Sequence, residues 1–214
     1  MDIVELAPRG VLAEARQRVD YAYFPHSAVV SFMATMQDRG VAETATVGRE
    51  GFLGFQPLLG SPLATNRMLV QVPGYASRIA VRQLVAEFND SPSLRSVLLQ
   101  YIGLLLVQTM QSVACNGLHR IEGRYCRWLL TAHDGAGRDE FPITQEFLAE
   151  LLSVHRPTVT IVARAMQHAG VIRYRRGVIT IQDRKALEAA ACECYAVVRR
   201  AFDKRFPGRR SRAR

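Results

Sequence analysis

Lysine is almost missing from this basic chain. Of its 28 basic residues only Lys185 and Lys204 are lysines, so the other 26 are arginines. The formal net charge is +9 and the isoelectric point is about 9.9. A polyanion, most commonly nucleic acid, is therefore the first partner to consider.

The chain also lacks an apolar leader and a long hydrophobic run. Residues 1–5 are acidic and have none of the apolar character of a secretory signal peptide. The longest apolar run, residues 97–110, is interrupted by two glutamines and is shorter than the roughly 20 residues that a membrane span needs. The sequence therefore predicts a cytoplasmic protein without a membrane partner.

The four cysteines, Cys115, Cys126, Cys192 and Cys194, show none of the paired spacings of metal sites. Without an export signal, reduced thiols are expected. Cys192 and Cys194 could form a redox pair, but a helix with one packed thiol and one near the surface explains the same spacing. His119 and His133 lie in no haem-binding pattern. We therefore expect no metal and no cofactor.

Positive charge is concentrated in the last third of the chain. Residues 1–90 carry 8 basic and 9 acidic side chains, residues 91–134 carry 4 and 2, and residues 135–214 carry 16 and 8. A tail with Arg209, Arg210, Arg212 and Arg214 supplies part of this excess, but residues 135–206 alone still carry a net +4. This asymmetry indicates a roughly neutral module joined to one that binds a polyanion.

Residues 20–90 have the pattern of short strands separated by turns. β-Branched and aromatic residues gather in residues 21–24, 29–33, 42–47, 68–72 and 76–79, with glycines and prolines between these segments. Strands of this length and spacing predict an antiparallel β-barrel or sandwich.

A long helix is expected at residues 93–116, where apolar residues recur in steps of three and four. One face carries the candidate dimer contacts Leu94, Val97, Tyr101, Leu104, Leu105, Gln108 and Gln111. A second apolar face consists of Ile102, Leu106, Val107 and Met110. Such a helix must pack against its own domain and a further surface, and a second copy of the chain is the simplest partner.

The helix is expected to end at Asn116 and Gly117, which tolerate the left-handed conformation common at helix ends. We interpret this dipeptide as a hinge. A second helix is expected at about residues 118–133, followed by a polar break at residues 134–137.

Residues 144–166 have the spacing of a helix-turn-helix motif. Thr144 can cap the first helix, Ala149 lies where two helices would cross, and Pro157 fits the first turn of the second helix. Ser153 occupies a turn position that usually has glycine, at a cost of ~1 kcal/mol for positive φ. Arginine on the second helix can read guanine in the major groove. The candidate DNA-contacting residues here are Thr144, His155, Arg156, Pro157, Thr158, Thr160 and Arg164.

Two alternating apolar runs in residues 171–181 flank Arg176-Gly177, which is a hairpin signal. Arg173, Arg175 and Arg176 would cluster at the tip and lie along DNA phosphates. Helix, turn, helix and hairpin in this order predict a winged helix-turn-helix. The alternative, an ordinary helical domain with a solvated basic face, does not account for the complete order.

The order of β-rich module, long helix, hinge and basic winged helix resembles the Crp/Fnr family of bacterial transcription regulators. Residues 141–149, FPITQEFLA, resemble the opening of that family's DNA-binding motif, and residues 153–159, SVHRPTV, resemble its turn and recognition-helix start. The resemblance covers nearly the whole chain. It implies an α+β fold with a truncated antiparallel β-barrel of the cyclic-nucleotide-binding kind, a dimerisation helix and a C-terminal winged helix-turn-helix.

The resemblance also implies a division into a sensor-like part, residues 1–116, and a DNA-binding part, residues 117–214. Arg156 occupies the place of the arginine that contacts a base edge in the family. Pro157 and Ile161 stand where a family pattern has glutamate and a second arginine, so that pattern's DNA preference is not carried over.

Residues 47–54 lie where the family has its phosphate-binding cassette, which implies an effector pocket at Glu50, Gly51 and Arg67. Phe55 replaces the glutamate that would hold a ribose hydroxyl, and the spacing to Arg67 is longer than in nucleotide binders. We therefore expect a degenerate pocket and no requirement for cyclic AMP. Iron–sulphur sensing, seen in some relatives, would need cysteines near the start, whereas the first here is Cys115.

These patterns favour a dimeric, sequence-specific transcription regulator that binds a palindromic operator in double-stranded DNA. RNA polymerase and an unidentified small-molecule effector are further candidate partners. A non-specific architectural DNA-binding protein is the alternative. An enzyme is not expected, because no Ser/His/Asp grouping, nucleotide loop or metal-ligand spacing is present in the sequence.

Overall fold

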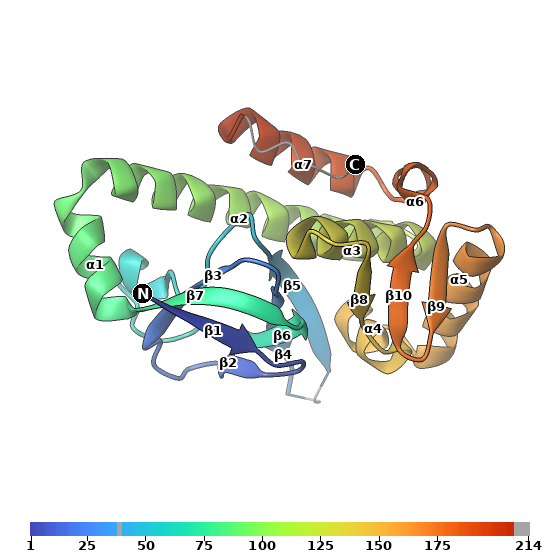
Figure 1. Ribbon diagram of the computed structural model, residues 1–214, viewed down its shortest axis with the longest axis horizontal. Helices are drawn as coiled ribbons and strands as arrows, with labels where there is room; N and C mark the ends of the chain where they lie inside the picture. The colour runs from blue at the N-terminus through green and yellow to red at the C-terminus, as the bar shows by residue number, and fades with distance from the viewer. Residues whose placement is uncertain (38–39, 208–214) are drawn as a thin grey trace.

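The computed structural model describes residues 1–37 and 40–207. β-Strands dominate the first third of the chain, one long helix crosses the molecule, and a mainly helical part follows (Figure 1). The tail arginines Arg209, Arg210, Arg212 and Arg214 lie outside the described residues.

The N-terminal strands form two antiparallel sheets rather than one closed barrel. The strands are β1 (Asp2–Leu6), β2 (Val11–Ala13), β3 (Tyr21–Pro25), β4 (Val29–Thr35), β5 (Val41–Val47), β6 (Arg67–Val72) and β7 (Gly74–Ala80). One sheet has the order β1-β7-β3 and the other the order β2-β6-β4-β5. The five expected strands are confirmed as β3 to β7, and β1 and β2 add an edge strand to each sheet.

The long helix is α2 (Pro92–Leu118), which follows α1 (Val81–Asp90). Ser91 separates the two helices and caps α2, because its Oγ accepts a hydrogen bond from the Leu94 N–H at 3.3 Å. The expected end at Asn116 and Gly117 is wrong, since both residues are helical. The chain breaks at His119 and Arg120, whose ψ angles of 144° and 156° are extended. One glycine costs a helix only ~1 kcal/mol, which packing can outweigh.

By length and composition, α2 would be able to cross a membrane, and about a third of its most apolar window is buried. The helix is longer than the apolar run of residues 97–110 because it continues on both sides of it. Within its own chain it packs against β5, α1 and α7.

The remaining elements build the C-terminal part. They are α3 (Ile121–Ala136), β8 (Glu140–Pro142), α4 (Gln145–Leu152), α5 (Arg156–His168), β9 (Ile172–Arg175), β10 (Val178–Ile181), α6 (Arg184–Ala190) and α7 (Cys194–Arg205). The polar break expected at residues 134–137 begins later than predicted, because α3 continues to Ala136 and ends at Gly137 with φ of 67°. Helix α7 lies beside α2 (Figure 1), and the Phe202 ring contacts that of Tyr101 at 6.3 Å between centroids.

The C-terminal part docks directly on the four-stranded sheet. Glu43 on β5 is buried, and its carboxylate accepts hydrogen bonds from the Trp128 indole of α3 at 3.2 Å and from Ser31 at 2.8 Å. The Arg9 guanidinium pairs with Glu150 of α4 at 3.0 Å. The N-terminal part therefore holds α3 and α4, and α4 is the first helix of the helix-turn-helix.

Candidate nucleic-acid interface

Helices α4 and α5 form the helix-turn-helix predicted from the sequence. Thr144 caps α4, since its Oγ1 accepts a hydrogen bond from the Phe147 N–H at 3.2 Å. Ser153 ends α4 with φ of 52°, in the left-handed region expected at this turn position. Ala149 is buried, and its carbonyl accepts a hydrogen bond from the Val154 N–H at 3.0 Å. The local chemistry of these residues sets the angle at which α5 leaves the turn.

The second helix, α5, buries one side and leaves the other free. Val159 and Val162 point into the core. Of the predicted contact residues, the structure exposes Thr144, His155, Arg156, Pro157 and Arg164 and partly buries Thr158 and Thr160. A surface hollow on this side is lined by Gln145, Arg156, Pro157, Thr160, Ile161 and Arg164. The hollow thus brings predicted contact residues of α5 together with the start of α4.

Arg156 and Thr160 are held by residues of α4. The Arg156 Nε lies 3.6 Å from a Glu146 carboxylate oxygen, and both side chains are more than half exposed. The Thr160 hydroxyl donates to Gln145 Oε1 at 2.6 Å. An exposed ion pair contributes only ~0–1 kcal/mol, so Arg156 can leave Glu146 for another acceptor at little cost.

The predicted contact residues did not include Gln145 or Ile161, although the resemblance had placed Ile161 where a family pattern has a second arginine. Ile161 is 69% exposed although it is a large apolar residue. Its spacing of four residues from Pro157 and three from Arg164 placed it on the outward face, and this periodicity was the available signal. An exposed isoleucine at that position can contact a thymine methyl group.

The wing is the hairpin of β9 and β10, which pair from Val178↔Arg175 to Ile181↔Ile172. Arg176 and Gly177 form its turn with φ of 50° and 77°, as a two-residue turn with both φ positive requires. The side chains of Arg173, Arg175 and Arg176 are exposed. The Gly177 carbonyl accepts a hydrogen bond from the N–H of Ile143, next to Thr144, at 2.8 Å. The wing arginines and the start of α4 therefore border one surface.

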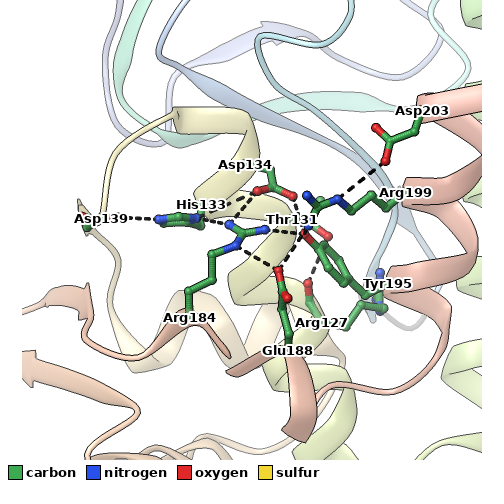
Figure 2. A network of polar contacts seen from close by, with 10 residues as sticks. All are labelled: Arg127, Thr131, His133, Asp134, Asp139, Arg184, Glu188, Tyr195, Arg199 and Asp203. Carbon is green, nitrogen blue, oxygen red and sulfur yellow. Dashed lines mark hydrogen bonds and ion pairs between the residues drawn. The ribbon is translucent and has the colours of Figure 1, made fainter. Parts of the chain in front are cut away.

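A network of polar side chains fastens the helices behind this surface (Figure 2). Asp134 at the end of α3 forms an ion pair with the Arg184 guanidinium at 2.7 Å and accepts a hydrogen bond from the Tyr195 hydroxyl at 2.6 Å. Arg184 also contacts Glu188 at 3.0 Å. His133 reaches Asp139 at 2.6 Å. The network joins α3, α6 and α7, and its centre is Asp134.

Asp134 should make the stability of the protein depend on pH in the acid range. Burial raises its pKa, but hydrogen bonds from His133, Arg184 and Tyr195 outweigh burial and hold the pKa at about 2. A carboxyl whose pKa is lowered by folding stabilises the fold above its unfolded pKa, near 4, and loses that contribution as the pH falls toward 2. We expect a loss of about 2 kcal/mol in the free energy of unfolding over this range.

Urea denaturation at several pH values measures this effect. Asp134→Asn should remove that part of the acid dependence and destabilise the protein at neutral pH. Asp90→Asn, at an exposed residue outside the network, is the matched control. An unchanged acid dependence in Asp134→Asn would contradict the assignment.

The residues of the expected effector pocket make their contacts in different places. Glu50 accepts a hydrogen bond from the Gly48 N–H at 2.7 Å. Gly51 lies against Tyr101 of α2, where an added Cβ would stand 1.9 Å from the phenol oxygen. The Arg67 Nε pairs with Glu14 at 3.3 Å. Glu50 and Gly51 thus contact the cassette itself and α2, whereas Arg67 contacts the segment after β2.

Aromatic rings fill the space beside this segment. The Phe52 ring stacks on Phe24 at 5.4 Å and contacts Tyr101 at 5.3 Å and Phe55 at 6.4 Å. Phe55 also meets Phe32 at 5.7 Å. Phe55, which the sequence resemblance places at the position of a ribose-binding glutamate, therefore belongs to an apolar cluster.

The seven residues expected at the dimer interface do not form one exposed face. The structure buries Tyr101, Leu104, Leu105 and Gln108, partly buries Leu94 and Gln111, and exposes Val97. Gln108 Oε1 accepts a hydrogen bond from the Thr46 N–H of β5 at 3.1 Å. Most of the expected face therefore packs inside its own chain, because α2 is apolar on all sides and the sequence pattern does not say which side meets the sheet.

Comparisons with known proteins agree with this geometry. Residues 123–190 match the Crp-like helix-turn-helix domain. No curated protein sequence matches significantly. Among solved structures, FixK2 from Bradyrhizobium japonicum is similar with a TM-score of 0.74 at 11% identity, covering 89% of this chain and 97% of that one.

Two Crp-family transcriptional regulators from Thermus thermophilus are also similar. TTHB099 has a TM-score of 0.71 at 15% identity and covers 89% of this chain and 96% of its own. TTHA1359 has a TM-score of 0.67 at 20% identity and covers 89% and 98%. Residues 123–190 thus contain a Crp-like helix-turn-helix domain, and the chain as a whole has the fold of solved Crp/Fnr-type regulators.

Proposed function

We propose that the protein is a homodimeric, sequence-specific transcription regulator that binds a palindromic operator. The observation that carries this proposal is the outward face of α5, where an exposed arginine and an exposed isoleucine stand beside a basic wing. Residues near 1–116 would form the sensor-like part and residues near 117–214 the DNA-binding part. The protein would act in the cytoplasm and contact RNA polymerase there, and no enzymatic activity is part of the proposal.

The dimer contact is proposed on the exposed side of α2. This exposed stripe consists of Leu99, Gly103, Leu106, Met110 and Val113, at alternating steps of four and three residues. Leu106 is 54%, Met110 63% and Val113 70% exposed. Alternating three- and four-residue steps are the spacing of a coiled-coil seam, which a second α2 helix can cover. The open space around Gly103 would allow the two helices to approach closely.

Each half of the operator would receive one α5 helix in its major groove, with half-sites one helical turn, roughly 34 Å, apart. Arg156 would read a guanine through its O6 and N7 atoms, and Ile161 would contact a thymine methyl group. Arg173, Arg175 and Arg176 would lie along phosphates, which hold the protein without reading sequence.

An effector, if one acts, would differ from cyclic AMP. The Phe24–Phe52–Phe55 cluster fills the space beside the cassette, and Arg67 is paired with Glu14. Proteins of this fold differ in their effectors: a c-di-GMP-responsive global regulator from Xanthomonas campestris is similar with a TM-score of 0.62 at 16% identity. We propose that a change at the α2–α3 break would reorient the DNA-binding part.

Calorimetric titration with cyclic AMP should show no binding at micromolar concentrations. Phe55 leaves no carboxylate for a ribose hydroxyl, and the Phe24–Phe52–Phe55 cluster lies beside the cassette. Arg67→Ala is the matched variant and should give the same flat titration. A saturable micromolar signal that Arg67→Ala abolishes would overturn this prediction.

Selection of bound sites from a random DNA pool tests the proposed function. A palindrome with two half-sites one helical turn apart is the expected product. Affinity should then be measured for that palindrome and for a random duplex over a range of salt concentrations, because phosphate contacts alone bind any sequence. Equal affinity for both duplexes would favour the architectural DNA-binding protein instead.

A further inference from the structure

Four potential metal ligands from distant parts of the chain meet at the junction of α2 and α7. Cys115 and His119 lie one turn apart at the end of α2, and Cys192 and Cys194 lie at the start of α7. One ligand atom from each of the four lies within 4.8 Å of all the others. The Cys115 and Cys192 sulfurs are 3.5 Å apart, as are the Cys194 sulfur and the His119 Nδ1.

The two 3.5 Å separations match edges of a site for a single tetrahedral ion. Zinc–sulfur bonds of about 2.3 Å and zinc–nitrogen bonds of about 2.0 Å give tetrahedron edges of roughly 3.5–3.8 Å. Three thiolates and one imidazole are one of the usual ligand sets of structural zinc sites, which need four protein ligands and no open position.

The surroundings of the four ligands support the same conclusion. The second ring nitrogen of His119, Nε2, bonds the Glu193 carboxylate at 3.1 Å, which leaves Nδ1 directed at the sulfurs. A carboxylate on the outer nitrogen is the usual partner of a zinc-binding histidine, because it fixes the tautomer and the ring orientation. The Gln111 amide also donates a hydrogen bond to the Cys194 sulfur at 3.1 Å.

Charge and access are suitable as well. Three thiolates, each with a charge of −1, and one Zn²⁺ ion together carry a net charge of about −1. Arg124 and Arg127 of α3 interact electrostatically with Cys115 and would offset it. Cys115 and Cys194 are buried, whereas Cys192 and His119 are partly exposed, so an ion can enter from the solvent side.

We propose that Cys115, His119, Cys192 and Cys194 bind one Zn²⁺ ion that ties the α2–α3 junction to the start of α7. The three thiols release their protons to solvent when the ion binds. Neutral His119 keeps the proton on Nε2 and donates it in a hydrogen bond to Glu193. Cys192 also donates its backbone N–H to the Gly123 carbonyl in the first turn of α3 at 3.2 Å. The ion would therefore hold α2, α3 and α7 in one arrangement.

Sequence spacing led to the expectation of no metal site, because the two pairs of ligands are more than 70 residues apart. The signals that were present are the one-turn spacing of Cys115 and His119 and the alternation of Cys192 and Cys194. Neither pair alone suffices for a metal, and only the packing of α7 on α2 unites them.

Titration of the reduced, metal-free full-length protein with Co²⁺ tests the proposal without relying on DNA binding. One Co²⁺ per chain should bind and give the intense visible bands and the sulfur charge-transfer band of a tetrahedral thiolate complex. One equivalent of Zn²⁺ should bleach these bands. A weak octahedral spectrum, or no saturable binding, would overturn the proposal.

Variants then assign the ligands. Cys192→Ser should weaken Zn²⁺ binding by more than about 100-fold, and the exposed Glu193→Gln by about 10- to 100-fold, as for an outer carboxylate partner. Cys126→Ala is the matched control, because this thiol contacts Met166 and lies outside the cluster, and it should bind Zn²⁺ like the unchanged protein. Equal affinity in Cys192→Ser would reject the assignment, as would iron with acid-labile sulfide in the purified protein.

Hydrogen exchange tests the structural role. Zn²⁺ should slow amide exchange at the start of α7 and at the α2–α3 junction, with little change in the β-sheets. If the amides of these helices exchange at the same rates with and without bound Zn²⁺, the proposed link between the helices is wrong. The outcomes of the Co²⁺ titration, the ligand variants and the hydrogen-exchange measurement do not depend on whether the protein binds DNA.

Discussion

Leu106→Asp should convert the proposed dimer into monomers while each subunit stays folded. Leu106 lies in the middle of the exposed stripe of α2 and is 54% exposed in the single chain. In a symmetric dimer the variant would place two unpaired carboxylates in the interface, one from each subunit. Each would cost ~3–5 kcal/mol. The dimer dissociation constant should therefore rise by roughly 10⁴-fold or more.

Analytical ultracentrifugation measures the change, and circular dichroism should show unaltered helix content. Operator affinity should fall as well, since two separate monomers lose the gain that comes from binding two linked half-sites. Leu105→Asp is the informative comparison, because Leu105 is only 5% exposed and faces the chain's own core. It should unfold the subunit instead. A Leu106→Asp protein that stays dimeric at micromolar concentration would reject the stripe as the interface.

Arg156→Ala should flatten the preferred DNA sequence at one base pair in each half-site. A bidentate arginine–guanine contact contributes ~1–3 kcal/mol of discrimination, so a dimer that loses two of them loses about 2–6 kcal/mol. The ion pair between Arg156 and Glu146 does not prevent Arg156 from contacting guanine, because an ion pair this exposed is weak. Site selection followed by affinity measurement on single-base variants of the operator gives the result.

Arg176→Ala should behave in the opposite way. Arg176 stands in the wing turn, where it would meet phosphate, so its loss should weaken all sequences alike. The slope of log affinity against log salt should become shallower by about one unit for each lost contact. Arg200→Ala removes an equal charge from the exposed side of α7 and should change neither the motif nor the slope. An intact motif in Arg156→Ala would assign reading to another residue of α5, such as His155 or Thr160.

The features that local chemistry dictates were predictable from the sequence. The Thr144 cap, the left-handed Ser153 and the Arg176-Gly177 turn each depend on a few neighbouring residues, and all three occur as expected. The strands β3 to β7 followed from β-branched and aromatic runs between glycines and prolines. These elements position the surface of α5.

The features that depend on tertiary packing were not predictable. Helix α2 is apolar all round, so periodicity could not tell that Leu105 faces the sheet and Leu106 faces solvent. The end of α2 was misplaced because a glycine costs a helix only ~1 kcal/mol, so the helix continues through Gly117. The group of three cysteines and a histidine arises only where α7 returns to α2.

The hydrogen bond between Glu43 and Trp128 gives the protein a built-in optical reporter. Trp128 is the one tryptophan of the chain, and its indole lies buried between the sheet and α3. Any movement that separates the DNA-binding part from the sheet must break this bond and let water reach the indole. Tryptophan emission of the unlabelled protein would then shift to longer wavelength, so a ligand or DNA that reorients the two parts can be followed in real time.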